Sequence, residues 1–80
     1  MDVDTIYKRI AEILEEDDVD ASVVFENCEV WDSLAALSII ALMDSSCGVM
    51  ITAEELNNLK TVGELLSLVE LKQSMLKTNE

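Results

Sequence analysis

Residues 32–48 read DSLAALSIIALMDSSCG, and this stretch decides the fold. Asp32 and Ser33 are residue types that favour the N-cap of a helix. Gly48 is the residue type that most readily adopts the left-handed conformation that ends a helix. Between them the chain is almost uncharged, and its apolar residues recur at helical spacing. The sequence therefore predicts a helix over residues 33–47.

The two sides of this helix differ in the size of their side chains. On a helical projection Ser38, Ala41 and Ser45 gather on one side. The opposite side carries the residues expected to face the core: Ala36, Ile39, Ile40, Met43 and Cys47. We expect the side with Ser38, Ala41 and Ser45 to face solvent, although its side chains are small rather than charged.

Two more helices are predicted downstream. Thr52-Ala-Glu-Glu55 and Thr61-Val-Gly-Glu64 each place a threonine three residues before a glutamate, which is the spacing of a capping box. They predict a short helix over residues 53–59 and a longer one over residues 62–76. The apolar residues between Gly48 and Thr52 are expected to form a buried connection, because a single strand there would have no partner.

Upstream, residues 4–16 predict an amphipathic helix, since Ile6, Ile10, Ile13 and Leu14 recur at helical spacing. Residues 17–31 show no sustained period and predict a long loop, and long loops often border functional sites. The chain, with two glycines and no proline, is thus expected to be a single all-α domain over residues 1–80. It would be a four-helix bundle with three longer helices, one short third helix and a long first loop.

Composition excludes several classes of function. With 17 acids against 5 bases the net charge is −12, which repels nucleic acids and anionic membranes and favours basic protein partners. The longest uncharged run, residues 33–43, is shorter than the ~20 residues of a membrane span. Asp2 and Asp4 stand where a secretory signal would carry bases, so we expect a cytoplasmic protein.

Catalysis by this chain alone is not expected. It contains no histidine, the usual acid or base near neutral pH, and zinc sites of the Cys/His type cannot be assembled. We assign no catalytic residue and no metal ligand. Cys28 and Cys47 lie far apart without CxxC spacing, which argues against a disulfide and for a reducing compartment.

Asp32-Ser33-Leu34 is the candidate functional site, because it places an exposed serine after a long loop at the first turn of an apolar helix. Taken alone, the residues are more typical of an ordinary N-cap. The whole chain, from about residue 4 to residue 72, resembles acyl carrier proteins, whose D-S-L motif opens the second helix. Ile51, residues 52–56 (TAEEL) and residues 60–65 (KTVGEL) resemble the family's buried isoleucine, short third helix and entry to the fourth helix.

The resemblance implies a bundle of the acyl carrier type and a carrier rather than an enzyme. A phosphopantetheinyl transferase would attach 4′-phosphopantetheine from coenzyme A to the Ser33 hydroxyl in a magnesium-dependent reaction. Asp32 would cap the helix and orient the serine, and Leu34 would be a docking contact. The arm would carry acyl groups as thioesters for acyl-loading and acyl-processing enzymes. The interior around Ile39, Ile40, Met43 and Leu66 would be either ordinary core or an acyl pocket.

Departures from the family pattern bear on the pathway. Many fatty-acid carriers have acids along the exposed face of the second helix, where this chain has Ala35, Ser38, Asp44 and Ser45. The residues predicted to dock partners are Trp31, Ala35, Ser38, Ala41 and Asp44, while most of the acidity lies in the first loop: Glu15, Glu16, Asp17, Asp18 and Asp20. Trp31 would be either an interface anchor or a side chain packed on the core. We therefore expect a stand-alone carrier for fatty-acid-like or specialised acyl or polyketide biosynthesis, or alternatively for aminoacyl or peptidyl groups.

Two interpretations from other classes remain open. Asp18, Asp20, Ser22 and Glu29 follow the ligand spacing of an EF-hand calcium loop, but Val23 stands where that loop needs glycine. Alternatively, Ser33 is only a cap in a helical interaction domain. In that case the outer face formed by Ala35, Ser38 and Ala41 would contact another helix.

Overall fold

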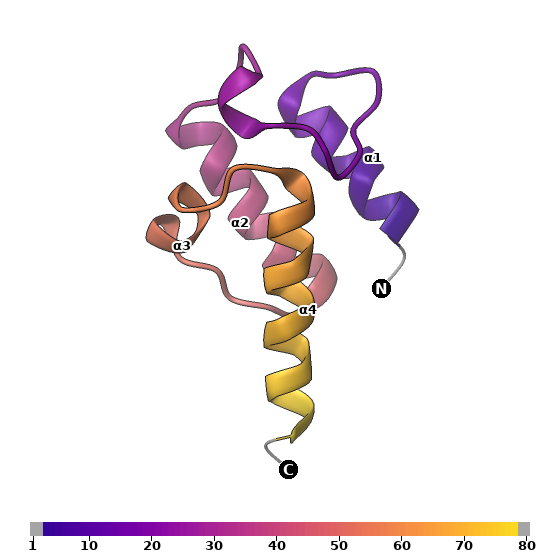
Figure 1. Cartoon of the computed structure of the whole chain (residues 1–80), viewed down its shortest axis with the longest axis vertical. Coiled ribbons are helices and arrows are strands. Elements are labelled where there is room, and N and C mark those ends of the chain that lie inside the picture. The colour runs from indigo at the N-terminus through magenta and orange to yellow at the C-terminus, as the bar shows by residue number, and fades with distance from the viewer. Residues whose placement is uncertain (1–2, 79–80) are drawn as a thin grey trace.

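The computed structural model describes residues 3–78, and their side chains as far as Met75. Four α-helices and one short 3-10 helix follow in the order α1 (Val3–Leu14), η1 (Phe25–Asn27), α2 (Ser33–Cys47), α3 (Ala53–Asn57) and α4 (Val62–Thr78). Figure 1 shows the first loop passing over one end of the bundle and α4 extending beyond the other helices at the opposite end. The expected four-helix bundle with a short third helix and a long first loop is confirmed.

Helix α2 has the bounds that its capping residues predict. The Asp32 carboxylate accepts a hydrogen bond from the Ala35 backbone N–H at 2.9 Å. At the other end Gly48 has φ 65°, the left-handed conformation, and its N–H donates to the Asp44 carbonyl at 3.1 Å. Because a side-chain cap fixes the start of α2 and a left-handed glycine fixes its end, Ser33 has a defined place in the first turn.

The other helices differ from prediction by one or two residues at their ends. Helix α1 ends at Leu14 rather than residue 16, because Glu15 takes a left-handed φ of 55°. The Glu16 N–H then donates to the Ala11 carbonyl at 2.9 Å, the hydrogen bond of a Schellman motif. Helix α3 ends at Asn57 rather than residue 59, and α4 continues to Thr78 rather than ending at residue 76.

Both predicted capping threonines accept their hydrogen bonds. Thr52 Oγ1 accepts from the Glu55 N–H, and Glu55 Oε1 accepts from the Thr52 N–H, both at 3.0 Å. At α4, Thr61 Oγ1 accepts from the Glu64 N–H at 3.1 Å. The Glu64 carboxylate accepts instead from the Lys60 N–H, at 2.8 Å, so the second box is closed one residue further upstream than the pattern predicts.

One hydrophobic core joins all the helices and the first loop, with α2 in contact with α1, α3 and α4. Its fully buried members are Ile10 and Leu14 of α1, Ile39 and Met43 of α2, Leu56 of α3, and Val62, Leu65 and Val69 of α4. Val49 and Ile51 are also buried, as expected for the connection between α2 and α3, but Met50 between them is 69% exposed, so the expectation is wrong for that residue. The buried side chains of the described part are all apolar.

The long first loop is held firmly against the start of α4. Phe25 is buried in the core, and its N–H donates to the Lys60 carbonyl at 3.0 Å. The Val62 N–H returns a hydrogen bond to the Val23 carbonyl, also at 3.0 Å. At Gly63 a Cβ would lie 2.9 Å from the Ala21 carbonyl oxygen, so the close approach of loop and helix requires glycine there. The loop therefore delivers the chain to Ser33 along a fixed path.

Neither cysteine forms a disulfide. Cys28 is buried and Cys47 half-buried, and burial raises the pKa of both thiols. Between residues 3 and 78, no helix has the length and apolar character needed to cross a membrane.

Candidate functional site

Ser33 is exposed in the first turn of α2. Its hydroxyl makes no hydrogen bond with any part of the chain that the structure describes. Two other α2 serines differ: Ser38 Oγ donates to the Leu34 carbonyl at 3.1 Å and Ser45 Oγ to the Leu42 carbonyl at 3.3 Å. The Ser33 hydroxyl is thus accessible and available for chemistry.

Asp32 serves the backbone rather than the serine. Its Oδ1 accepts from the Ala35 N–H at 2.9 Å, and its carbonyl accepts from the Ala36 N–H at 3.0 Å. The carboxylate is therefore engaged in capping α2, as the sequence predicts. The chain has no histidine, so it offers no imidazole beside Ser33.

Ser33 borders a hollow between α2 and α3, with a volume of about 250 Å³. Its lining is Trp31, Asp32, Ser33, Ala36, Leu37, Ile40, Ala53 and Asn57. The Trp31 ring stacks on the Phe25 ring, with 4.6 Å between their centroids. Of the two alternatives for Trp31, this contact favours a side chain packed on the core over an exposed interface anchor. The hollow is mainly apolar, with Asp32 its only charged side chain.

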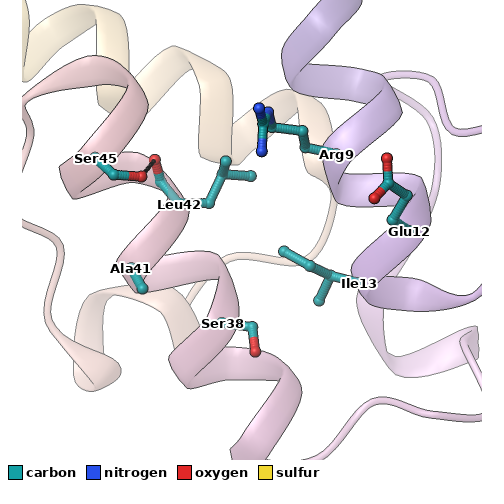
Figure 2. A pocket seen from close by; sticks show the side chains of 7 residues that line it. All are labelled: Arg9, Glu12, Ile13, Ser38, Ala41, Leu42 and Ser45. Atoms are coloured by element: carbon teal, nitrogen blue, oxygen red, sulfur yellow. Dashed lines mark hydrogen bonds between the residues drawn. The ribbon is translucent and has the colours of Figure 1, made fainter.

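On the other side of Asp32 a groove runs between α1 and α2. Its nearer part, about 320 Å³, is lined by Ile13, Glu15, Val30, Asp32, Leu34, Ala35 and Ser38. Its farther part, about 460 Å³, is lined by Arg9, Glu12, Ile13, Ser38, Ala41, Leu42 and Ser45 (Figure 2). Because the two parts share Ile13 and Ser38, we treat them as one feature, the α1–α2 groove. In Figure 2 Arg9 and Ile13 point from α1 toward α2.

The predicted docking residues are not equally available. Leu34 is 71% exposed, Ala41 and Asp44 are exposed, and Trp31 and Ser38 are half-buried. Ala35 is only 7% exposed, although it lines the nearer part of the α1–α2 groove, so its role in docking stays a prediction. Ala35, Ile39 and Leu42 form a buried stripe at helical spacing, so the buried side of α2 is rotated from the predicted one.

The predicted acyl interior is mostly closed. Ile39 and Met43 are fully buried in the packed core, and Leu66 is 6% exposed. Ile40 alone of the four lines the hollow beside Ser33. The observations therefore favour ordinary core for the centre of the bundle, and the hollow between α2 and α3 is the accessible apolar surface that borders Ser33.

The first loop does not form the calcium site that its spacing suggests. Asp20 Oδ1 accepts hydrogen bonds from the Ser22 N–H at 2.9 Å and the Ser22 hydroxyl at 2.6 Å. These hydrogen bonds lower the pKa of Asp20. Among the residues described, no three Cys, Asp or Glu side chains converge to hold a metal ion.

Sequence analysis missed the α1–α2 groove, and with it the position of Glu12 and Glu15 beside α2. The clustering of acids at the end of the first helix was the signal that could have indicated it.

Comparison with known proteins adds a match over residues 4–69 to the family model described as "Phosphopantetheine attachment site". Neither the curated proteins nor the solved structures include a match to the chain.

Proposed function

The chain belongs to the phosphopantetheine-attachment family, and we propose that Ser33 bears the prosthetic group of a stand-alone acyl carrier. The observation that supports this most strongly is the exposed Ser33 hydroxyl, which has no hydrogen-bond partner in the described structure and stands at the first turn of α2. Members of the family hold 4′-phosphopantetheine covalently and are modified by phosphopantetheinyl transferases. The chain would act as a carrier and not as a catalyst.

The first turn of α2 suits a phosphodiester. In the transferase reaction Ser33 Oγ would bond to the phosphorus of the phosphopantetheine part of coenzyme A, and adenosine 3′,5′-bisphosphate would leave. A base on the transferase would take the hydroxyl proton, because the Asp32 carboxylate is engaged with the Ala35 N–H. The remaining N–H groups and the dipole of a 15-residue helix favour the negative charge that results.

The hollow between α2 and α3 suits the arm and the group it carries. It opens beside Ser33 and offers the apolar surfaces of Trp31, Leu37 and Ile40. When bound, the group supplies a thiol that holds acyl groups as thioesters, and loading and processing enzymes would act on them. Because the bundle centre is closed by Ile39 and Met43, we propose that the cargo lies in this hollow.

The outer face of α2 supports a proposal about the pathway. Ser38, Ala41 and Ser45 carry no charge there, and Asp44 is the exposed acid. We therefore propose a carrier for a specialised acyl or polyketide route in the cytoplasm rather than for general fatty-acid synthesis. Residues 1–80 would form one carrier domain. The same uncharged face leaves an aminoacyl or peptidyl carrier as the second candidate.

The test is the intact mass of the protein before and after incubation with coenzyme A, magnesium and a promiscuous phosphopantetheinyl transferase. The wild-type chain should gain one phosphopantetheine, and Ser33→Ala should gain none. Ser46→Ala, which removes another exposed α2 hydroxyl, should be modified like the wild type. A folded wild-type protein that gains no mass would favour the helical interaction domain instead.

A further inference from the structure

The α1–α2 groove reaches the residues that flank Ser33. Asp32 and Leu34, its two neighbours in the chain, both line the nearer part. Leu34 is 71% exposed, a large apolar side chain at the edge of the groove. Any enzyme that reaches Ser33 Oγ must cover surface next to it, so the groove is continuous with the contact area that such an enzyme needs.

Charge distinguishes this groove from the hollow on the other side of Ser33. Glu15 and Asp32 line its nearer part, beside the serine, and Glu12 and Arg9 both line its farther part. Neither Glu12 nor Glu15 forms an ion pair within the described residues. The hollow toward α3 has no charged lining residue other than Asp32. An electrostatically steered partner would therefore meet its complement on the α1 side.

The chemistry of the transferase says which sign its surface carries. Coenzyme A has a diphosphate and a further phosphate, and enzymes bind such groups with lysine and arginine side chains. We therefore expect the rim of the transferase active site to be positively charged. This rim must approach Ser33 closely. The carboxylates of Glu12 and Glu15 are complementary to this rim.

We propose that the phosphopantetheinyl transferase docks in the α1–α2 groove. There Glu12 of α1, and Glu15 directly after that helix, would meet basic side chains of the enzyme. Apolar side chains of the enzyme would contact Leu34 and Ile13, and the surface facing Arg9 would be acidic or neutral. The charges that steer the enzyme thus come from the first helix and its end, and α2 contributes small residues that leave the groove open. This proposal rests on the proposed function of Ser33.

Steady-state kinetics of a promiscuous transferase with coenzyme A and varied carrier concentration test the proposal. Glu15→Lys should raise the KM for the carrier about tenfold at low ionic strength with kcat nearly unchanged, because it reverses a steering charge. Added salt should shrink the difference. Glu70→Lys is the matched control, since it makes the same change of net charge at an exposed α4 residue outside the groove. Its KM should change less than about twofold.

Glu15→Gly separates docking from folding. It removes the carboxylate while relieving the left-handed φ of 55°, so a raised KM in a stabilised protein cannot be attributed to unfolding. Equal KM values for Glu15→Lys and Glu70→Lys, with wild type modified normally, would overturn the groove proposal and leave the function of Ser33 intact. A folded wild-type chain that is not modified at all would overturn both.

Discussion

The ring of Trp31 stacks on the ring of Phe25, with 4.6 Å between centroids and 24° between planes. Phe25 is buried in the core, while Trp31 is half-buried and lines the hollow beside Ser33. This pair connects the core directly to the wall of the candidate site. The packing of the first loop against the core therefore determines the shape of the surface next to Ser33.

Phe25→Leu should lower the free energy of unfolding by about 1–2 kcal/mol, because it removes the stacked pair and part of the buried ring. Trp31 is the only tryptophan, so its fluorescence reports on the same contact. Its emission should shift to the red as the ring becomes more hydrated. Denaturant unfolding followed by fluorescence measures both, and an unchanged emission spectrum in the folded variant would contradict the stacking account.

Glu15→Gly should stabilise the protein by about 0.5–1 kcal/mol. A left-handed φ costs a residue with a Cβ about 1–2 kcal/mol, and glycine avoids this cost at some loss of chain entropy. Glu12→Gly is the control, since it places glycine inside α1 and should destabilise by about 1 kcal/mol. Thermal unfolding of the two variants should therefore move in opposite directions, and a loss of stability in Glu15→Gly would contradict the assigned backbone.

Asp32→Ala should cost about 1 kcal/mol, since it removes the acceptor for the Ala35 N–H at the start of α2. Asp32→Asn retains a side-chain oxygen for the same hydrogen bond and should stay within about 0.5 kcal/mol of the wild type. Denaturant titration compares the three proteins. Equal stability of all three would mean that the Asp32 carboxylate does not stabilise the start of α2 by capping.

Glu55 should make the stability of the protein depend on pH in the acid range. Its hydrogen bonds with the Thr52 N–H and with Lys72 Nζ, 2.9 Å away, lower the pKa of its carboxyl group. A carboxyl group whose pKa is lower in the folded state stabilises the fold above its unfolded pKa of about 4.3. This contribution is lost as the pH falls through the folded value.

Glu55→Gln should therefore show a shallower loss of stability than the wild type as the pH falls below about 4.3. Glu54→Gln is the matched control, because Glu54 is the preceding residue of α3 and makes neither contact. Thermal unfolding at a series of acid pH values measures the slopes. A Glu55→Gln protein with the wild-type slope would show that these contacts do not persist in solution.

Local sequence chemistry predicts the elements whose ends are capped. Asp32 and Gly48 fix both ends of α2, and Thr52 and Thr61 fix the starts of α3 and α4. The end of α1 was not predictable in the same way, because glutamate is not a residue type that marks a left-handed C-terminal position. Tertiary contacts and the Schellman hydrogen bonds decide it.

The buried side of α2 and the groove beside it depend on how the helices pack. Because α2 is apolar almost all round, periodicity alone does not tell Ala35, which is buried, from Ala41, which is exposed. The groove is formed by two helices distant in sequence, so Glu12 and Ser38 share it only in the folded chain. The position of Ser33 was predictable, whereas its modification stays a prediction.

The central claim is that Ser33 is the attachment residue, and peptide-level mass spectrometry of the transferase-treated protein tests it most directly. Fragmentation should place one phosphopantetheine on Ser33 and leave Ser38, Ser45 and Ser46 unmodified. A phosphopantetheine found on any other residue, or none on a folded chain under conditions that modify a known carrier, would contradict it.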